Sequence, residues 1–169
     1  MIRIAVDAMG GDNGSQVVIR GVIEAAKRSS TQYLLVGKPR EIEAELSLSA
    51  SRPGNIDIVA ASEIIEMTEN PVEAFRRKPD ASVTVCAQLV KDGKADGFVT
   101  IANTGAAVTI SMMTLKRIRG VDRPAIATTL PTICGKVVLL DAGATPDCDS
   151  NNLYEFALMA APSRKKFTA

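Results

Sequence analysis

The sequence predicts an α/β protein with a mostly parallel sheet and an antiparallel hairpin near the C-terminal end. Two observations lead to this prediction. Short apolar runs alternate with longer segments of helical periodicity over residues 2–117, which is typical of βαβ units. Turn-forming glycine or asparagine residues lie where strands are expected to pass into helices.

The expected elements follow one another in a regular order along residues 2–117. We expect strands near Ile2–Val6, Tyr33–Val36, Ile56–Val59 and Gly97–Ile101. We expect helices near Ser15–Arg28, Arg40–Leu46, Ala81–Asp92 and Thr104–Arg117. The proline- and charge-rich segment Met67–Asp80 predicts a hinge, because Asn70-Pro71 opens a turn.

The alternation ends after residue 117. Ala125–Leu130 and Val137–Asp141 are separated only by residues 131–136, whereas a parallel crossover needs about a dozen residues. These two runs are therefore expected to pair antiparallel. A short helix over Asn151–Met159, capped by Ser150 or Asp149, is expected to follow.

Composition excludes several classes of protein. The 169 residues suit one domain with a core, and 46% hydrophobic with 23% charged residues excludes a disordered chain. A net charge of +1 predicts no nucleic-acid partner. Three cysteines without a Cys-x-x-Cys pair suit a reducing compartment, and the N-terminus has no signal-peptide core, so we expect a cytoplasmic protein. The absence of histidine excludes Ser-His and Cys-His mechanisms.

The first candidate site is the octapeptide Asp7-Ala8-Met9-Gly10-Gly11-Asp12-Asn13-Gly14, between the first strand and the first helix. Adjacent glycines let a ligand approach the backbone, and the helix start offers unpaired N–H groups to an anion. In open α/β sheets, ligands bind at such strand-to-helix turns. A tight turn in which Asp12 or Asn13 merely caps the helix is the alternative.

A second turn of the same kind is Thr100-Ile101-Ala102-Asn103-Thr104-Gly105. If the strands are parallel, its N–H groups and the Thr104 hydroxyl reach the same sheet edge as the two glycines of the first turn. The two turns would then form a phosphate cradle. A helix cap without a ligand is again the alternative.

Charged residues supply further candidates. Arg76, Arg77 and Lys78 precede a helix that Asp80 or Ser82 would cap, and cations there oppose the helix dipole, so an anion is expected to offset them. A solvated charge run is the alternative. Arg123, in the turn before Pro124, is another anion clamp or the partner of a nearby carboxylate.

Two aspartates, Asp7 and Asp141, end predicted strands, and we expect both carboxylates at the same edge of the sheet. There they would orient a nucleophile or a ligand hydroxyl. We expect no metal site, because no third carboxylate has a matching spacing and the chain lacks histidine.

Four segments together carry a resemblance to a known family. They are Asp7-Ala8-Met9-Gly10-Gly11-Asp12, Asn103-Thr104-Gly105-Ala106, Gly120-Val121-Asp122-Arg123-Pro124-Ala125 and Leu139-Leu140-Asp141-Ala142-Gly143. With these segments the chain resembles the phosphate acyltransferases of bacterial phospholipid synthesis, the PlsX family. The resemblance implies a doubly wound sheet in a three-layer α/β/α arrangement. The resemblance runs from Ile2 to about Met159 and covers about the first half of a family member. Ala160–Ala169 matches nothing, and we expect a disordered tail there.

The chain departs from the family pattern at two places. Family members usually have Ser-Ala-Gly before the Asn-Thr-Gly-Ala segment, whereas this chain has Thr100-Ile101-Ala102. A branched side chain and an alanine narrow the freedom of that backbone, which puts close approach of a ligand there in doubt. Ala81 also stands where the family has a serine.

The resemblance implies transfer of a fatty acyl group from acyl carrier protein to inorganic phosphate, giving acyl phosphate, with no cofactor. Phosphate is itself the nucleophile, so the protein has only to position an anion and stabilise the developing oxyanion. The implied phosphate-binding residues are Gly10, Gly11, Asp12, Ser82, Asn103, Thr104 and Gly105. Lys78 and Arg123 would neutralise charge and Asp7 would orient the reactants. A homodimer, and peripheral membrane association through the other half of a family member, are implied as well.

Two other functions stay open. One is a different enzyme of the same fold group, such as an acyl-coenzyme A phosphotransferase. A nucleotide-dependent dehydrogenase is disfavoured, because no Gly-x-Gly-x-x-Gly follows the first strand. The other is a truncated half-domain that folds, associates with itself and catalyses nothing.

Overall fold

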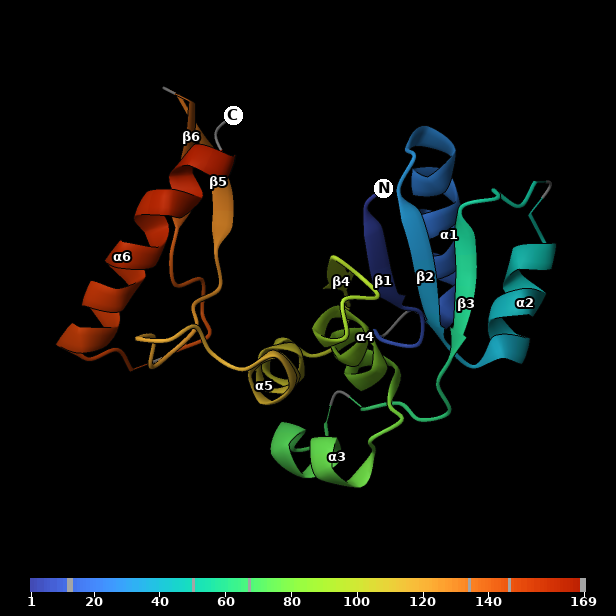
Figure 1. Cartoon of the computed structure of the whole chain (residues 1–169), viewed down its shortest axis with the longest axis horizontal. Coiled ribbons are helices and arrows are strands. Elements are labelled where there is room, and N and C mark those ends of the chain that lie inside the picture. Colours follow the sequence, from blue (N-terminus) through green and yellow to red (C-terminus); the bar gives the residue numbers. More distant parts are fainter. Residues whose placement is uncertain (12–13, 50, 67, 134, 146, 168–169) are drawn as a thin grey trace. The chain divides into compact units, whose positions relative to one another are not determined.

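The computed structural model describes residues 1–11, 14–49, 51–66, 68–133, 135–145 and 147–167, with residues 162–167 as backbone alone. The chain divides into two units where the sequence suggested one domain. Residues Met1–Lys116 form the N-terminal unit and Arg117–Ala169 form the C-terminal unit (Figure 1).

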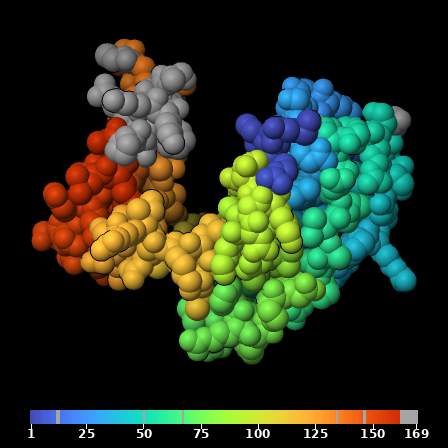
Figure 2. Space-filling model, viewed as in Figure 1, coloured from blue at the N-terminus to red at the C-terminus, as the bar shows by residue number. Residues whose placement is uncertain are grey.

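The N-terminal unit contains a parallel sheet with the strand order β3-β2-β1-β4. Its strands are β1 (Arg3–Asp7), β2 (Gln32–Gly37), β3 (Ile56–Ala60) and β4 (Gly97–Val99). The register pairs Val6 with both Leu35 and Val99. In Figure 2 the dark-blue start of β1 lies at the surface beside the yellow-green segment that leads into β4. The predicted parallel βαβ units are therefore confirmed, and β1 lies at the point where the strand order reverses.

Helices cover both faces of this sheet. On one face, α1 (Gly14–Arg28) and α2 (Pro39–Ser47) pack against Val6 and Leu35 (Figure 1). On the other face, α4 (Ser82–Lys91) brings Cys86 against Ala5 and Val36. Successive strand residues point to opposite faces, so neighbouring apolar residues of β1 and β2 serve two cores. This confirms the predicted three layers.

The segment that was expected to be a hinge contains a helix, α3 (Pro71–Arg77). The Asn70 side chain caps it, accepting hydrogen bonds from the N–H groups of Val72 and Glu73 at 3.1 and 3.2 Å. Pro71 occupies the first turn, where its missing N–H costs nothing, so the proline starts a helix. Met67, at the start of the predicted hinge, lies outside the described residues. Helix α3 packs with α4 and α5 (Thr104–Leu115) around a cluster that includes Ile65 and Ile110.

The C-terminal unit confirms the predicted antiparallel hairpin. Strands β5 (Thr128–Thr132) and β6 (Gly135–Leu139) pair with Leu130 opposite Val137. Asp149 caps the following helix, α6 (Ser150–Phe167), by accepting the N–H of Asn152 at 2.8 Å. This helix continues past Met159, so the backbone of residues 160–167 is helical where a disordered tail was expected. Over the described residues, no helix is both long and apolar enough to cross a membrane.

Candidate functional site

The carboxylate of Asp7 joins the two glycine-bearing turns. Asp7 ends β1 and is only 1% exposed. Its Oδ1 accepts the backbone N–H groups of Met9 and Gly10 at 3.1 and 3.2 Å. Its Oδ2 accepts the hydroxyl of Thr100, just past the end of β4, at 2.8 Å. The side chain that was expected to orient a reactant therefore also connects the backbone of the first turn to Thr100 of the second turn.

The two glycines of the first turn allow that turn to contact the second. A Cβ atom added at Gly10 would lie 2.7 Å from Oδ2 of Asp7 and 3.2 Å from the backbone nitrogen of Ala102. A Cβ atom at Gly11 would lie 2.5 Å from Cδ1 of Ile101, and Gly11 also has a φ of +87°. The two turns thus lie at one edge of the sheet, as the parallel strands predicted. Asp12, the next residue of the motif, lies outside the described residues.

Ile101 gives the departure from the family pattern a structural consequence. Its side chain covers Gly11 on one side, although 48% of the residue is exposed. The Cβ atom of Ala102 likewise lies 3.3 Å from the position of an added Cβ at Gly10. Access of a ligand to these two glycines is therefore limited to the sides that Ile101 and Ala102 leave open.

The second turn of the candidate site includes the start of α5. Asn103 is the N-cap, and its side-chain oxygen accepts the N–H of Gly105 at 2.7 Å. Thr104 and Gly105 are exposed at the surface of the N-terminal unit. The capping role that the sequence suggested for this segment is thus present, and it engages the N–H group of Gly105.

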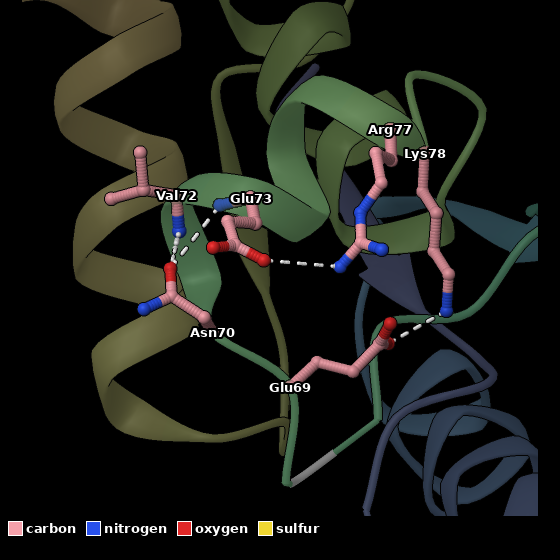
Figure 3. A network of polar contacts seen from close by, with 6 residues as sticks. All are labelled: Glu69, Asn70, Val72, Glu73, Arg77 and Lys78. Atoms are coloured by element: carbon pink, nitrogen blue, oxygen red, sulfur yellow. Dashed lines mark hydrogen bonds and ion pairs between the residues drawn. The ribbon is translucent and has the colours of Figure 1, made fainter.

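Lys78 already has acidic and carbonyl partners. Its Nζ donates to Oε2 of Glu69 at 2.6 Å and to the carbonyl of Ile64 at 2.7 Å. Figure 3 shows this pair beside the ion pair of Arg77 with Glu73, 3.3 Å apart. The hydrogen bond from Lys78, followed by that from the backbone of Glu66, lowers the pKa of Glu69. Carboxylates of the same segment therefore offset much of the charge that had suggested a bound anion.

The start of α4 differs from the prediction. Its N-cap is Ala81, which makes no side-chain cap, so the prediction of a cap by Asp80 or Ser82 is wrong. Asp80 instead accepts the backbone N–H and hydroxyl of Ser62 at 2.7 and 2.5 Å, and these bonds lower its pKa. Ser82 is buried, and its N–H donates to the carbonyl of Glu63 at 3.0 Å. Asp80 and Ser82 are thus hydrogen-bonded to residues 62–63, and neither caps α4.

Asp141 follows a strand of a different sheet from that of Asp7, so the prediction of a shared sheet edge is wrong. The hairpin forms a sheet of its own, and Asp141 follows β6 in the C-terminal unit. Burial raises the pKa of Asp141, but the N–H groups of Ile126, Ala144 and Thr145 donate to its carboxylate at 2.7–3.2 Å. These bonds outweigh burial and lower the pKa.

Arg123 also belongs to the C-terminal unit, and its side chain is exposed. Its backbone N–H donates to Oε2 of Glu155 at 3.4 Å, and the N–H of Asp122 donates to the same oxygen at 3.0 Å. The buried carboxylate of Glu155 therefore orders the backbone of this turn. The guanidinium of Arg123 remains a candidate anion ligand by prediction alone.

Sequence reasoning missed Thr100. The sequence analysis included the residue only as part of a turn. Strands β1 and β4 are parallel, β1 ends in an aspartate, and a hydroxyl residue follows β4, so the sequence already indicated that these two side chains could form a hydrogen bond.

Cys86 lies near the same carboxylate, where burial and then the charge of Asp7 raise the pKa of its thiol. In the part of the chain that the structure describes, no cluster of three or more histidine, cysteine or acidic residues could hold a metal ion.

Comparison with known proteins agrees with the sequence resemblance. The family model described as "Fatty acid synthesis protein" matches residues 2–166, so the match extends past Met159 into the segment that seemed unrelated. The chain is 48% identical over 161 residues to the phosphate acyltransferases of Heliobacterium modesticaldum and Desulforamulus reducens. Each alignment covers 95% of this chain and 48% of the relative. The chain therefore spans about half the length of these curated relatives.

Two solved structures share the fold. A phosphotransacetylase from Streptococcus pyogenes has a TM-score of 0.77 at 20% identity, covering 99% of this chain and 55% of that one. The EutD phosphotransacetylase from Staphylococcus aureus has a TM-score of 0.71 at 19% identity, covering 98% and 53%. At this level of identity, the similarity establishes the fold.

Proposed function

Because this chain belongs to the family of fatty acid synthesis proteins, we propose that it forms the phosphate-binding part of a phosphate acyltransferase. The proposed reaction transfers a fatty acyl group from acyl carrier protein to inorganic phosphate and releases acyl phosphate. The observation that carries the proposal is the hydrogen bond between Thr100 and Asp7, which holds two strand-end turns together at one sheet edge. Ligands of open α/β sheets bind at such an edge.

The chemistry suits a site without histidine. A phosphate oxygen attacks the thioester carbonyl, a carbon–oxygen bond forms, and the carbon–sulfur bond breaks as the carrier thiolate leaves and takes up a proton. No side-chain nucleophile is needed, so positioning and oxyanion stabilisation are the main demands on the protein. The chain has no histidine to supply an imidazole base.

The proposed phosphate ligands are N–H groups and hydroxyls of the two turns. They come from Gly10, Gly11, Asp12, Asn103, Thr104 and Gly105, with Ser82 as a further candidate. The N–H groups of Gly10 and Gly105, which donate to Asp7 and Asn103 in the structure, would exchange these acceptors for phosphate. Lys78 is proposed to neutralise the bound charge, and Arg123 is proposed as an anion ligand of the C-terminal unit taken by itself. In this proposal the ammonium group of Lys78 leaves the carboxylate of Glu69 and binds phosphate, because either anion accepts a charge-assisted hydrogen bond from it.

A phosphate titration followed by amide NMR tests the location of the site. We expect the signals of Gly10, Gly11 and Gly105 to shift, while those of Gly54 and Gly93, on other loops of the N-terminal unit, stay unchanged. Shifts elsewhere with constant signals at the first three glycines would contradict the location. Replacing Lys78 by Met is expected to weaken phosphate binding about tenfold, because the variant loses one charge-assisted hydrogen bond to the anion.

The identity of the acyl donor requires a separate assay. Acyl phosphate formed from an acyl carrier protein thioester, measured by mass spectrometry, supports the proposal. Preference for acyl-coenzyme A would favour the second candidate function. Because the chain spans about half of its relatives, a lack of product from both donors would favour a non-catalytic half-domain.

Self-association belongs to the same proposal. Leu153, Tyr154 and Leu158 on α6 are 59%, 63% and 56% exposed, and Leu130 and Val137 of the hairpin are exposed as well. Apolar surface of this kind favours association, so we propose a homodimer. Light scattering that shows a monodisperse monomer would contradict the dimer.

We also propose a cytoplasmic location with peripheral membrane contact. Vesicle flotation tests the membrane contact.

A further inference from the structure

We infer that Thr100 is a positioning residue, whose hydroxyl sets the second turn against the first through the carboxylate of Asp7. The inference rests on the proposed function, because it concerns how the proposed phosphate ligands are held. Thr100 itself is not proposed to contact the phosphate. Its hydroxyl is engaged within the protein on both its donor and its acceptor side.

The hydroxyl of Thr100 forms a two-step connection. It donates to Oδ2 of Asp7 at 2.8 Å and accepts the backbone N–H of Ala102 at 3.1 Å. One oxygen atom therefore links the end of β1 to the first residues of the turn that leads into α5. Valine has the shape of threonine but provides neither bond, whereas serine can provide both.

The carboxylate of Asp7 is a rigid anchor. It is 1% exposed, and its other oxygen is bonded to the N–H groups of Met9 and Gly10. A buried carboxylate must keep its hydrogen-bond donors, since an unsatisfied buried acceptor is costly. Loss of the Thr100 hydroxyl removes a donor to Oδ2 and favours a rearrangement of the second turn.

Such a rearrangement would reach the proposed ligands directly. A Cβ atom added at Gly10 would lie 3.2 Å from the nitrogen of Ala102, so the backbones of the two turns are in close contact. Asn103 and Gly105 follow immediately and share a hydrogen bond of 2.7 Å. A shift of about 1 Å in a positioned group can cost about a hundredfold in function.

Phosphate titrations of variants of the 169-residue chain test the inference, with the dissociation constant measured by amide NMR. We expect Thr100→Val to weaken phosphate binding at least tenfold and Thr100→Ser to change it less than twofold. Thr84→Val is the matched control, because the buried hydroxyl of Thr84 has no hydrogen-bond partner among the described residues. Leu46→Ala controls for lost stability, since Leu46 is a core residue of α2. Both controls are expected to keep the phosphate affinity of the unchanged chain.

The outcomes separate this inference from the proposed function. Equal phosphate affinity of Thr100→Val and the unchanged chain would overturn the positioning role and leave the proposed function intact. An equal loss in Leu46→Ala would also overturn the positioning role. Failure of the unchanged chain to bind phosphate would overturn the proposed function and the positioning role with it. If Thr100→Val does not fold, Thr100→Ala, which removes the hydroxyl without adding bulk beside Asp7, must show the same loss.

Discussion

Replacement of Gly10 by alanine tests the contact between the two turns. The new methyl carbon would lie 2.7 Å from Oδ2 of Asp7, 3.2 Å from the nitrogen of Ala102 and 3.3 Å from its Cβ atom. The strain comes from these contacts, since the backbone of Gly10 does not adopt a positive φ. The carboxylate has little room to retreat, because three donors hold it in a buried position.

The expected cost follows from two effects. Overpacking a well-packed site costs about 1–3 kcal/mol. Displacing the carboxylate weakens hydrogen bonds to a charged group, each of which contributes about 1.5–3 kcal/mol. We therefore expect Gly10→Ala to lower the free energy of unfolding by about 1.5–3 kcal/mol, where the two ranges overlap. This is a large fraction of the 5–15 kcal/mol that stabilises a typical domain.

Gly21→Ala is the matched control. Gly21 lies within α1, and a Cβ atom added there meets nothing within 4 Å. Alanine has a higher helix propensity than glycine, so the control should gain about 1 kcal/mol. Urea titration, followed through the amide signals of β1 and β2, measures both variants. An unfolding free energy of Gly10→Ala equal to or above that of the unchanged chain would refute the contact.

Three further predictions follow from individual side chains. Cys86, with a buried thiol whose pKa is raised, should resist iodoacetamide in the folded chain, whereas the exposed Cys148 reacts; peptide mass spectrometry detects either result. The lowered pKa of Asp141 stabilises the C-terminal unit above the ordinary value of 3.8, and this stability is lost as pH falls through the folded pKa. Acid titration by NMR should therefore show that Asp141→Asn removes the dependence, and an unchanged dependence would contradict it. Lys78→Met should raise the pKa of Glu69 toward 4.5 in a carboxyl NMR titration, and a constant pKa would show that the pair is not formed in solution.

The sequence alone was sufficient for the order of the elements other than α3, and for the two turns. Short apolar runs indicate buried strands, and apolar residues at helical spacing indicate the buried faces of helices. Because the strands are parallel, both turns must lie at the same edge of the sheet. The hairpin followed from the short connection between its strands, since a parallel crossover does not fit there. These conclusions depend on local pattern and chain length, which are properties of the sequence itself.

Tertiary structure decided which polar groups meet. Asp7 and Thr100 are 93 positions apart, and only the β1–β4 pairing brings them within 2.8 Å. The partners of Lys78 and Asp141 depended likewise on how the chain folds back on itself, so the charge pattern did not reveal the bond of Lys78 to Glu69, and the pattern of strand ends assigned Asp141 to the wrong sheet. Side-chain hydrogen bonds form between groups that packing makes neighbours, and packing depends on contacts far apart in the sequence. The composition of the two turns was therefore evident from the sequence, but the bond that joins them was not.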